Sequence, residues 1–346
     1  MVNDNLRVIH LKGGGQMKLP RKQLALNIPE FTKQLEKFIK REKLNYDLIS
    51  CHYYFSGLIG IRIKNIFKTP LVITFHTLAL MKNLVAKTTD EMENTDRIKA
   101  EIMLMNQADK VIATSSTDAR YMETLYDCPK SKIFVLTPGI DHKLFKPLLK
   151  EACKVKIGAD LNHKLILFVG RIQPLKGIDV LLYALKNLIQ GKMHLDICLW
   201  IVGEDSNGKR ELKRLLKLQK LLNLHLFVKF IGKKKHHDLP YYYNSAEVVI
   251  MPSQYESFGI TTLEAMACGV PVITTDVTGV SNIYDKKHRS LITSASNPNL
   301  LAQKIDNLLT DKSRHKILSR EVAENVKSLS WNEAAGKFSM MIKNLN

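Results

Sequence analysis

Short runs of apolar and β-branched residues alternate with helical patterns along nearly the whole chain. Ten runs have the length and composition of strands, and apolar residues recur at helical spacing in 28–44, 90–107, 178–189 and 300–309. Alternation of this kind predicts parallel sheets with helices on both faces. Because ten strands are too many for one comfortable sheet, we expect two βαβ domains. The predicted strands are Arg7–Leu11, Asp47–Cys51, Leu71–Phe75, Lys110–Thr114, Lys132–Leu136, Leu165–Val169, Ile197–Val202, Leu226–Ile231, Val248–Met251 and Val272–Thr275.

The strand pattern stops within Pro138–Asp160, where proline and glycine residues interrupt the chain. We therefore place the hinge here and expect an N-terminal domain over 1–145 and a C-terminal domain over 146–325. The last segment, 326–346, contains the helical pattern Trp331–Leu345. Periodicity alone does not say where this helix packs.

The charge of the chain favours anionic partners. The sequence has 346 residues, with 52 Lys and Arg against 33 Asp and Glu, which gives a net charge of +19. Phosphorylated substrates, an anionic membrane surface and nucleic acid all fit this excess. Nucleic acid gains no support, because no aromatic platform is interleaved with the cations. The cations of 209–220 lie opposite leucines, which indicates an ordinary amphipathic helix, with peripheral contact to an anionic membrane as the alternative.

Nothing in the sequence predicts export or insertion into a bilayer. The start, MVNDNLRVIH, lacks the basic and apolar regions of a secretory signal. No apolar run approaches the roughly 18–20 residues that span a bilayer. The five cysteines are scattered without a CxxC pair, which is typical of reduced thiols and not of a disulfide framework or zinc site. We therefore expect a cytoplasmic protein.

The segment Glu256–Glu264 places two carboxylates around a glycine at the start of a predicted helix. The unpaired N–H groups of a helix N-terminus suit an anion. Gly259 lets a phosphate or sugar approach the backbone closely. This arrangement fits a nucleotide-sugar, with phosphate on the amides and one acid on each sugar. In the alternative, Glu256 merely caps the helix and Glu264 is solvated.

The loop Gly170–Gly177 carries two cations, Arg171 and Lys176, between a predicted strand and a predicted helix. A diphosphate requires paired cations and a close approach of the backbone. The glycine spacing fits neither a Walker A loop nor a Rossmann fingerprint. In the alternative, both cations are solvated. Ligands of open parallel sheets bind beyond the carboxyl ends of the strands, where this loop lies.

Two predicted strands of the first half end in histidines. His52 and Tyr53 follow one strand, and His76 and Thr77 follow the next. A histidine in this position can donate a hydrogen bond or polarise a hydroxyl, although a lone histidine is more often structural. A small upstream group of cations would either grip a phosphate or remain solvated: Lys18, Arg21 and Lys22.

Together, these segments resemble the donor half of a retaining glycosyltransferase of family 4, which has the two-domain GT-B fold. The resemblance covers 164–282. It is carried by Gly170-Arg171, Pro174-Leu175-Lys176-Gly177, Gly203-Glu204, Phe230-Ile231-Gly232, Pro252-Ser253, Glu256-Ser257-Phe258-Gly259 and Glu264 through Ile273. The first half is similar to the branch of sucrose-phosphate synthases, sucrose synthases and the mycothiol glycosyltransferase. That likeness rests on Tyr46–Ile49, His52-Tyr53, Ser56–Leu58 and Thr74–Leu78.

The resemblance implies two Rossmann-like domains that face each other across a cleft, and a donor role for each matching residue. Arg171 and Lys176 would hold the donor diphosphate and neutralise the leaving nucleotide. Glu256 would bind hydroxyls of the transferred sugar, and Glu264 would bind the ribose. Backbone amides would support the sugar and phosphate, from Phe258, Gly259 and Ile260.

The resemblance also implies an acceptor side. His76 would lie near the transferred sugar, and Lys22, Tyr53 and Thr77 would contact an acceptor phosphate. The family's reaction retains the anomeric configuration without an essential metal, so we expect no cofactor besides the nucleotide-sugar substrate. The family also sends its final helix back onto the first domain.

One departure from the family concerns the start of the chain. The segment Leu6–Leu11 matches a family segment that follows a strand, a glycine-rich loop, a helix and a second strand, so we expect an incomplete N-terminal domain. We expect a retaining glycosyltransferase that moves a hexosyl unit from a UDP-linked sugar to a small phosphorylated or lipid-linked acceptor. The alternative is a nucleotide-sugar-binding subunit that is catalytically impaired or needs a partner chain for the missing elements.

Overall fold

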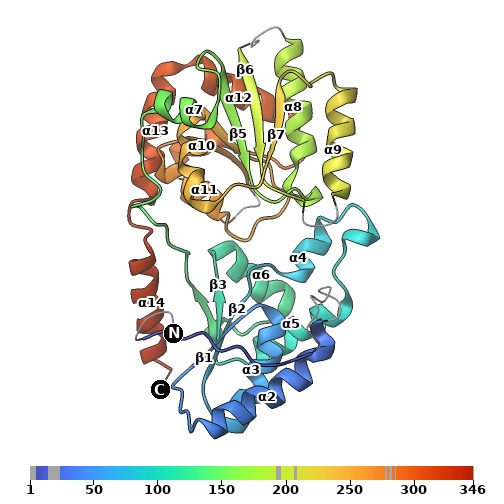
Figure 1. Ribbon diagram of the computed structural model, residues 1–346, viewed down its shortest axis with the longest axis vertical. Coiled ribbons are helices and arrows are strands. Elements are labelled where there is room, and N and C mark those ends of the chain that lie inside the picture. Colours follow the sequence, from blue (N-terminus) through green and yellow to red (C-terminus); the bar gives the residue numbers. More distant parts are fainter. Residues whose placement is uncertain are drawn as a thin grey trace.

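The computed structural model describes residues 5–14, 24–191, 196–205, 209–276, 279, 283–284 and 286–345. Two parallel sheets form two domains, which lie one above the other in Figure 1. The prediction of an α/β protein with two such domains is therefore confirmed. No helix within these ranges is long and apolar enough to cross a bilayer.

The N-terminal domain is built on a four-stranded parallel sheet. Its strands lie in the order β1 (Ile49–His52), β2 (Leu71–Thr74), β3 (Lys110–Ala113) and β4 (Ile133–Val135). Its helices are α2 (Ile28–Arg41), α3 (Tyr53–Phe67), α4 (Ala79–Leu84), α5 (Thr95–Gln107) and α6 (Ser116–Tyr126). β2 is buried at every position because helices cover both faces of the sheet. Ile73 packs in one cluster with residues of α3 and α5, and Val72 packs in another, on the opposite face.

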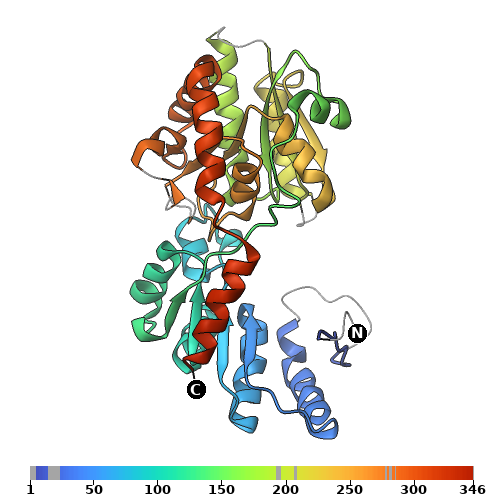
Figure 2. The same ribbon diagram turned by 90° about the vertical axis from the view of Figure 1, so that its left-hand side faces the viewer.

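The prediction of a strand at Arg7–Leu11 is wrong, because these residues form no strand. A strand needs the backbone of a neighbouring strand to complete its hydrogen bonds, and this segment lies instead beside α2 (Figure 2). Gly14 donates its backbone N–H to Glu30 of that helix, and Leu6 remains 53% exposed. The helix predicted over 90–107 begins later than expected, because Asn94 caps its N-terminus.

The C-terminal domain is built on a six-stranded parallel sheet with the order β10-β9-β8-β5-β6-β7. The chain runs outward from β5 through β6 to β7, and then places β8 on the other side of β5. The strand order therefore reverses between β5 and β8, and open α/β sheets bind ligands at such a switch point. The strands are β5 (Lys164–Val169), β6 (Ile197–Val202), β7 (Val228–Gly232), β8 (Val248–Met251), β9 (Val272–Thr275) and β10 (Ile292–Thr293). The helices are α7 (Lys150–Ile157), α8 (Ile178–Gln190), α9 (Arg210–Leu221), α10 (Leu239–Ser245), α11 (Ile260–Ala267), α12 (Pro298–Thr310) and α13 (Lys312–Val326).

Two segments of the chain cross between the domains side by side. The backbone N–H of Ile140 donates to the carbonyl of Leu329 at 3.0 Å, and Ile140 forms a bridge with Ser330. After this second crossing, α14 (Trp331–Lys343) returns to the N-terminal sheet, as Figure 2 shows. There Met341 packs in one cluster with Val72 of β2.

Candidate active site

Two loops of the C-terminal domain meet at the switch point. The β5 loop is residues 170–177, which follow β5, and the β8 loop is residues 252–259, which follow β8. The backbone N–H of Gln254 donates to the carbonyl of Leu175 at 2.8 Å. The loops that the sequence singled out are therefore joined through their backbones at the carboxyl ends of adjacent strands.

Gly177 allows this close contact. It has φ +66°, and a Cβ atom on it would stand 2.1 Å from the carbonyl oxygen of Pro252. That distance is far below van der Waals contact, and the opposing atom belongs to the backbone and not to a side chain that can rotate away. Any other residue at this position would push the two loops apart.

Lys176 and Glu256 form an ion pair that joins the same loops. Nζ of Lys176 donates to Oε2 of Glu256. The lysine side chain is 8% exposed and the glutamate side chain 21% exposed, so the pair holds a buried cation next to a more accessible carboxylate. Arg171, on the β5 loop, is exposed and forms no ion pair with the described residues.

α11 begins directly after the β8 loop. Gly259 is its N-cap residue, and no side chain caps the helix, which excludes the alternative in which Glu256 does so. The end of the helix therefore presents backbone N–H groups and a partial positive charge that suit an anion. Phe258 is buried beside it, and Ile260 at the first helical position is 45% exposed.

Glu264 lies in α11 and is 4% exposed, so the alternative of a solvated side chain is wrong. Its Oε2 accepts a hydrogen bond from the Tyr243 hydroxyl at 2.8 Å, and its Oε1 lies 3.0 Å from Nε2 of His236. Burial raises the pKa of this carboxyl. Tyr243 and His236 orient the carboxylate, and no motif in the sequence points to either residue.

On the N-terminal side, His52 and His76 lie together, as their positions at the ends of β1 and β2 predict. Nδ1 of His52 is 3.1 Å from Nε2 of His76, and the rings are stacked with centroids 5.2 Å apart. Burial, with His52 beside it, lowers the pKa of His76. His76 therefore favours the neutral form, which keeps one ring nitrogen as an acceptor.

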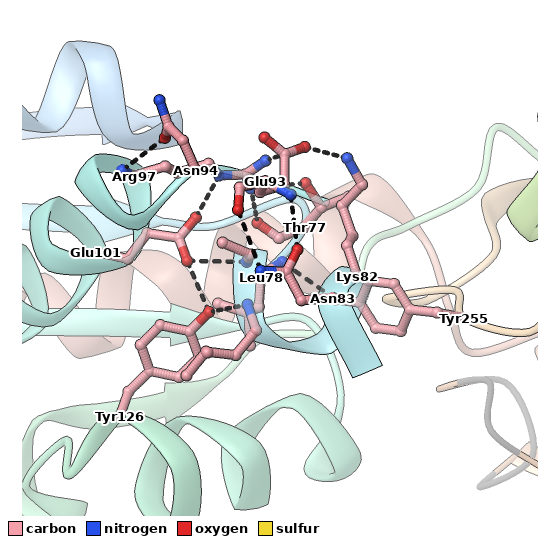
Figure 3. A network of polar contacts seen from close by, with 12 residues as sticks. Thr77, Leu78, Lys82, Asn83, Glu93, Asn94, Arg97, Glu101, Tyr126 and Tyr255 are labelled. Carbon is pink, nitrogen blue, oxygen red and sulfur yellow. Dashed lines mark hydrogen bonds and ion pairs between the residues drawn. The ribbon is translucent and has the colours of Figure 1, made fainter. Parts of the chain in front are cut away.

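Arg97 of α5 organises the segment that follows β2 (Figure 3). Its Nη2 donates to the carbonyl oxygen of Thr77 at 2.7 Å and to the Thr77 hydroxyl at 3.1 Å. Its guanidinium lies 4.9 Å from the centre of the Tyr53 ring. The structure thus groups a cation with two predicted acceptor residues. The third, Lys22, lies outside the described residues.

Arg97 is itself fixed by a buried acid. Its Nε donates to Glu101 at 2.7 Å, and both side chains are at most 1% exposed. Glu101 also accepts from the backbone N–H of Ala79 at 2.9 Å and from the Tyr126 hydroxyl at 2.7 Å. Sequence reasoning missed this pair, although their spacing of four residues on a helix would place the two side chains on one face.

The two halves of the site are in contact. The backbone N–H of Leu78 donates to the hydroxyl of Tyr255, a residue of the β8 loop, at 3.2 Å (Figure 3). Farther along the interface, Nζ of Lys87 lies 3.4 Å from a carboxylate oxygen of Asp179. The segment that carries His76 and Thr77 therefore touches the loop that carries Glu256.

Two glycosyltransferase family models match the chain. Residues 150–327 match the family Glycosyl transferases group 1, and residues 4–144 match Glycosyltransferase Family 4. The chain is 29% identical over 343 residues to a D-inositol 3-phosphate glycosyltransferase of Corynebacterium glutamicum, covering 98% of this chain and 82% of the relative. The corresponding enzyme of Corynebacterium urealyticum is 31% identical over 348 residues, with 99% and 82% covered.

A solved structure shares the fold. The sucrose-phosphate synthase of Thermosynechococcus elongatus superimposes with a TM-score of 0.88 at 28% identity, covering 97% of this chain and 82% of that chain. Two parallel-sheet domains joined by two crossing segments are the GT-B architecture that the resemblance implied. The chain belongs to the group 1 glycosyltransferases and is a glycosyltransferase of GT-B fold.

Proposed function

We propose that the protein transfers a hexosyl unit from a UDP-linked sugar to a small phosphorylated acceptor, with retention of the anomeric configuration. One observation carries the proposal. The Lys176–Glu256 pair lies at the switch point, on a loop that contacts the segment of His76 and Thr77 through Tyr255. A charged donor subsite and a polar acceptor subsite are thus joined across the domain interface.

The donor subsite would assist cleavage of the bond between the transferred sugar and the diphosphate. Lys176 and Arg171 would hold the diphosphate and neutralise the charge that develops on the leaving nucleotide, which supplies the main electrostatic stabilisation without a metal ion. Glu256 would accept hydrogen bonds from sugar hydroxyls. Glu264, oriented by Tyr243, would accept those of the ribose. The amides of 258–260 would contact the sugar and phosphate.

The acceptor subsite favours a phosphate. Tyr53 and Thr77 would supply hydroxyl groups to the acceptor phosphate. The Arg97 guanidinium, which is 1% exposed and paired with Glu93 and Glu101, contacts both residues and would hold them in place. The similar enzymes of Corynebacterium are named for D-inositol 3-phosphate, a small phosphorylated acceptor. A lipid-linked phosphate is the other acceptor that this chemistry would fit.

The test is a donor and acceptor screen with purified protein. UDP-, GDP- and ADP-sugars are each combined with sugar phosphates, inositol phosphates and phosphorylated lipids, with and without a metal chelator. Lys176→Ala and Glu256→Gln should lower kcat/KM by roughly 100-fold, and Lys213→Ala, on the exposed face of α9, serves as the control. Failure of the wild type to bind or turn over any of these donors would refute the proposal.

A further inference from the structure

A buried acid of the N-terminal domain holds the β8 loop from across the domain interface. Asp118, in the first turn of α6, is 1% exposed. The Ser257 hydroxyl donates to its Oδ2, and the Thr114 hydroxyl donates to the same oxygen at 2.6 Å. Ser257 is the residue next to Glu256. The carboxylate of Asp118 therefore binds the residue next to Glu256, the proposed ligand of the sugar.

The backbone of Ser257 is held from the same helix end. The hydroxyl of Ser115, the N-cap residue of α6, lies 3.3 Å from the carbonyl oxygen of Ser257 and also accepts from the backbone N–H of Asp118 at 3.0 Å. Both the side chain and the main chain of Ser257 are thus held by α6. We call this set of contacts the interdomain latch.

The interface around the latch is tightly packed. A Cβ atom on Gly279 would stand 2.4 Å from the Ser257 carbonyl oxygen and 2.8 Å from Cβ of Ser115. Gly279 therefore packs against both Ser257 of the β8 loop and Ser115 at the start of α6, where no larger side chain would fit.

Burying Asp118 is unfavourable unless its hydrogen bonds compensate. The two hydroxyls donate to an oxygen that is shielded from water, and hydrogen bonds to an ionised acceptor are roughly twice as strong as neutral ones. The titratable groups that face Asp118 are Glu256 and Tyr255, both on the β8 loop. Burial, and then the charge of Glu256, raise the pKa of Asp118, whereas the hydrogen bonds from the two hydroxyls lower it.

We propose that Asp118 is a positioning residue that fixes Glu256 through Ser257, so that the donor subsite takes its working geometry only when the domains are closed. This inference rests on the proposed function for the role of Glu256. Asp118 touches neither substrate. It acts on the reaction through the latch, which couples domain closure to the position of the sugar-binding carboxylate.

The first experiment needs no substrate. Hydrogen exchange of the β8 loop is measured on the unliganded full chain. Asp118→Ala and Ser257→Ala should each speed exchange of this loop roughly tenfold, and the double variant should exceed neither single variant by much, because both remove one contact. Asp118→Asn keeps an acceptor oxygen without the charge and should lie between. Glu123→Gln, an exposed acid on α6, is the matched control.

The second experiment measures kinetics of the same variants with the substrates found in the screen. Asp118→Ala should lower kcat and raise the donor KM while the acceptor KM stays unchanged, and Asp118→Asn should recover part of the loss. Because a buried substitution can prevent folding, circular dichroism is recorded for each variant. Ser257→Ala tests the same contact from the other domain, where only a hydroxyl is removed.

The outcomes separate the two proposals. Exchange that is unchanged in both alanine variants would overturn the latch. Faster exchange with unchanged kcat and donor KM would overturn the positioning role, because the contact would then be structural only. If the wild type neither binds nor transfers any sugar, the proposed function fails, whereas faster loop exchange in Asp118→Ala would still support the latch.

Discussion

Gly177→Ala tests whether the contact between the β5 and β8 loops sets the donor subsite. The substitution has two effects that the structure separates. The first is backbone strain, because φ is +66° and a residue with a Cβ loses roughly 1–2 kcal/mol in this conformation. The second is the contact of 2.1 Å with the Pro252 carbonyl, which requires one of the loops to move by roughly 1 Å.

A matched control isolates the second effect. Gly158 at the end of α7 has φ +72° but no atom within 4 Å of the Cβ position, so Gly158→Ala introduces strain alone. We expect Gly158→Ala to lower the free energy of unfolding by roughly 1–2 kcal/mol. Gly177→Ala should cost about 1–3 kcal/mol more through overpacking.

Catalytic rate and donor affinity should also distinguish Gly177→Ala from Gly158→Ala. A shift of about 1 Å in a loop that bears Lys176 or Glu256 can reduce catalysis about 100-fold, whereas Gly158 is remote from both loops. Urea unfolding gives the stabilities, and calorimetry with the donor gives the affinities. If Gly177→Ala is no less stable than Gly158→Ala and binds donor as the wild type does, the loop contact does not set the site.

Three further predictions concern the groups around the site. Tyr243→Phe removes one hydrogen bond to Glu264 and should weaken donor binding by roughly tenfold in calorimetry; unchanged affinity would remove Glu264 from the ribose subsite. Tyr126→Phe removes one of the hydrogen bonds to Glu101 and leaves the backbone N–H of Leu80 without the hydroxyl that accepts from it. It should lower the free energy of unfolding by about 1–3 kcal/mol and raise the acceptor KM more than the donor KM. Burial raises the pKa of Asp118 to about 6 from an ordinary 3.8, so the folded state keeps this proton where the unfolded chain has lost it. Relative to Asp118→Asn, the wild type should gain about 2 kcal/mol of stability as the pH falls from 6 to 4, by urea unfolding; a flat difference would contradict this assignment.

Local patterns in the sequence predicted most of the fold. Strands such as Leu165–Val169 are buried on both faces and read as continuous apolar runs, which short windows detect. One exception is Arg7–Leu11, whose pattern is that of a strand. Pattern alone cannot show whether a neighbouring strand is available for pairing, so this segment was assigned to a sheet that does not include it.

The candidate site divides in the same way. The residues of the proposed donor subsite lie in short motifs at strand ends, where a local pattern in the sequence can reveal them: Arg171, Lys176, Glu256 and Glu264. Arg97 lies in a helix twenty residues from the Thr77 that it contacts. Within α5 it has the surroundings of any surface cation, and only the folded chain shows that it is buried. Its role depends on tertiary contacts, which no local window contains.

The role proposed for Asp118 likewise depends on a tertiary contact, in this case across the domain interface. It is separated from Ser257 by 139 residues and lies in the other domain. The residues proposed to bind the donor therefore lie in one domain, while a residue proposed to position them lies in the other. Because the β8 loop carries both Glu256 and the contacts to Leu78 and Asp118, closure and donor positioning are one structural event. A variant that loosens the interface should thus weaken donor binding without changing any residue that touches the donor.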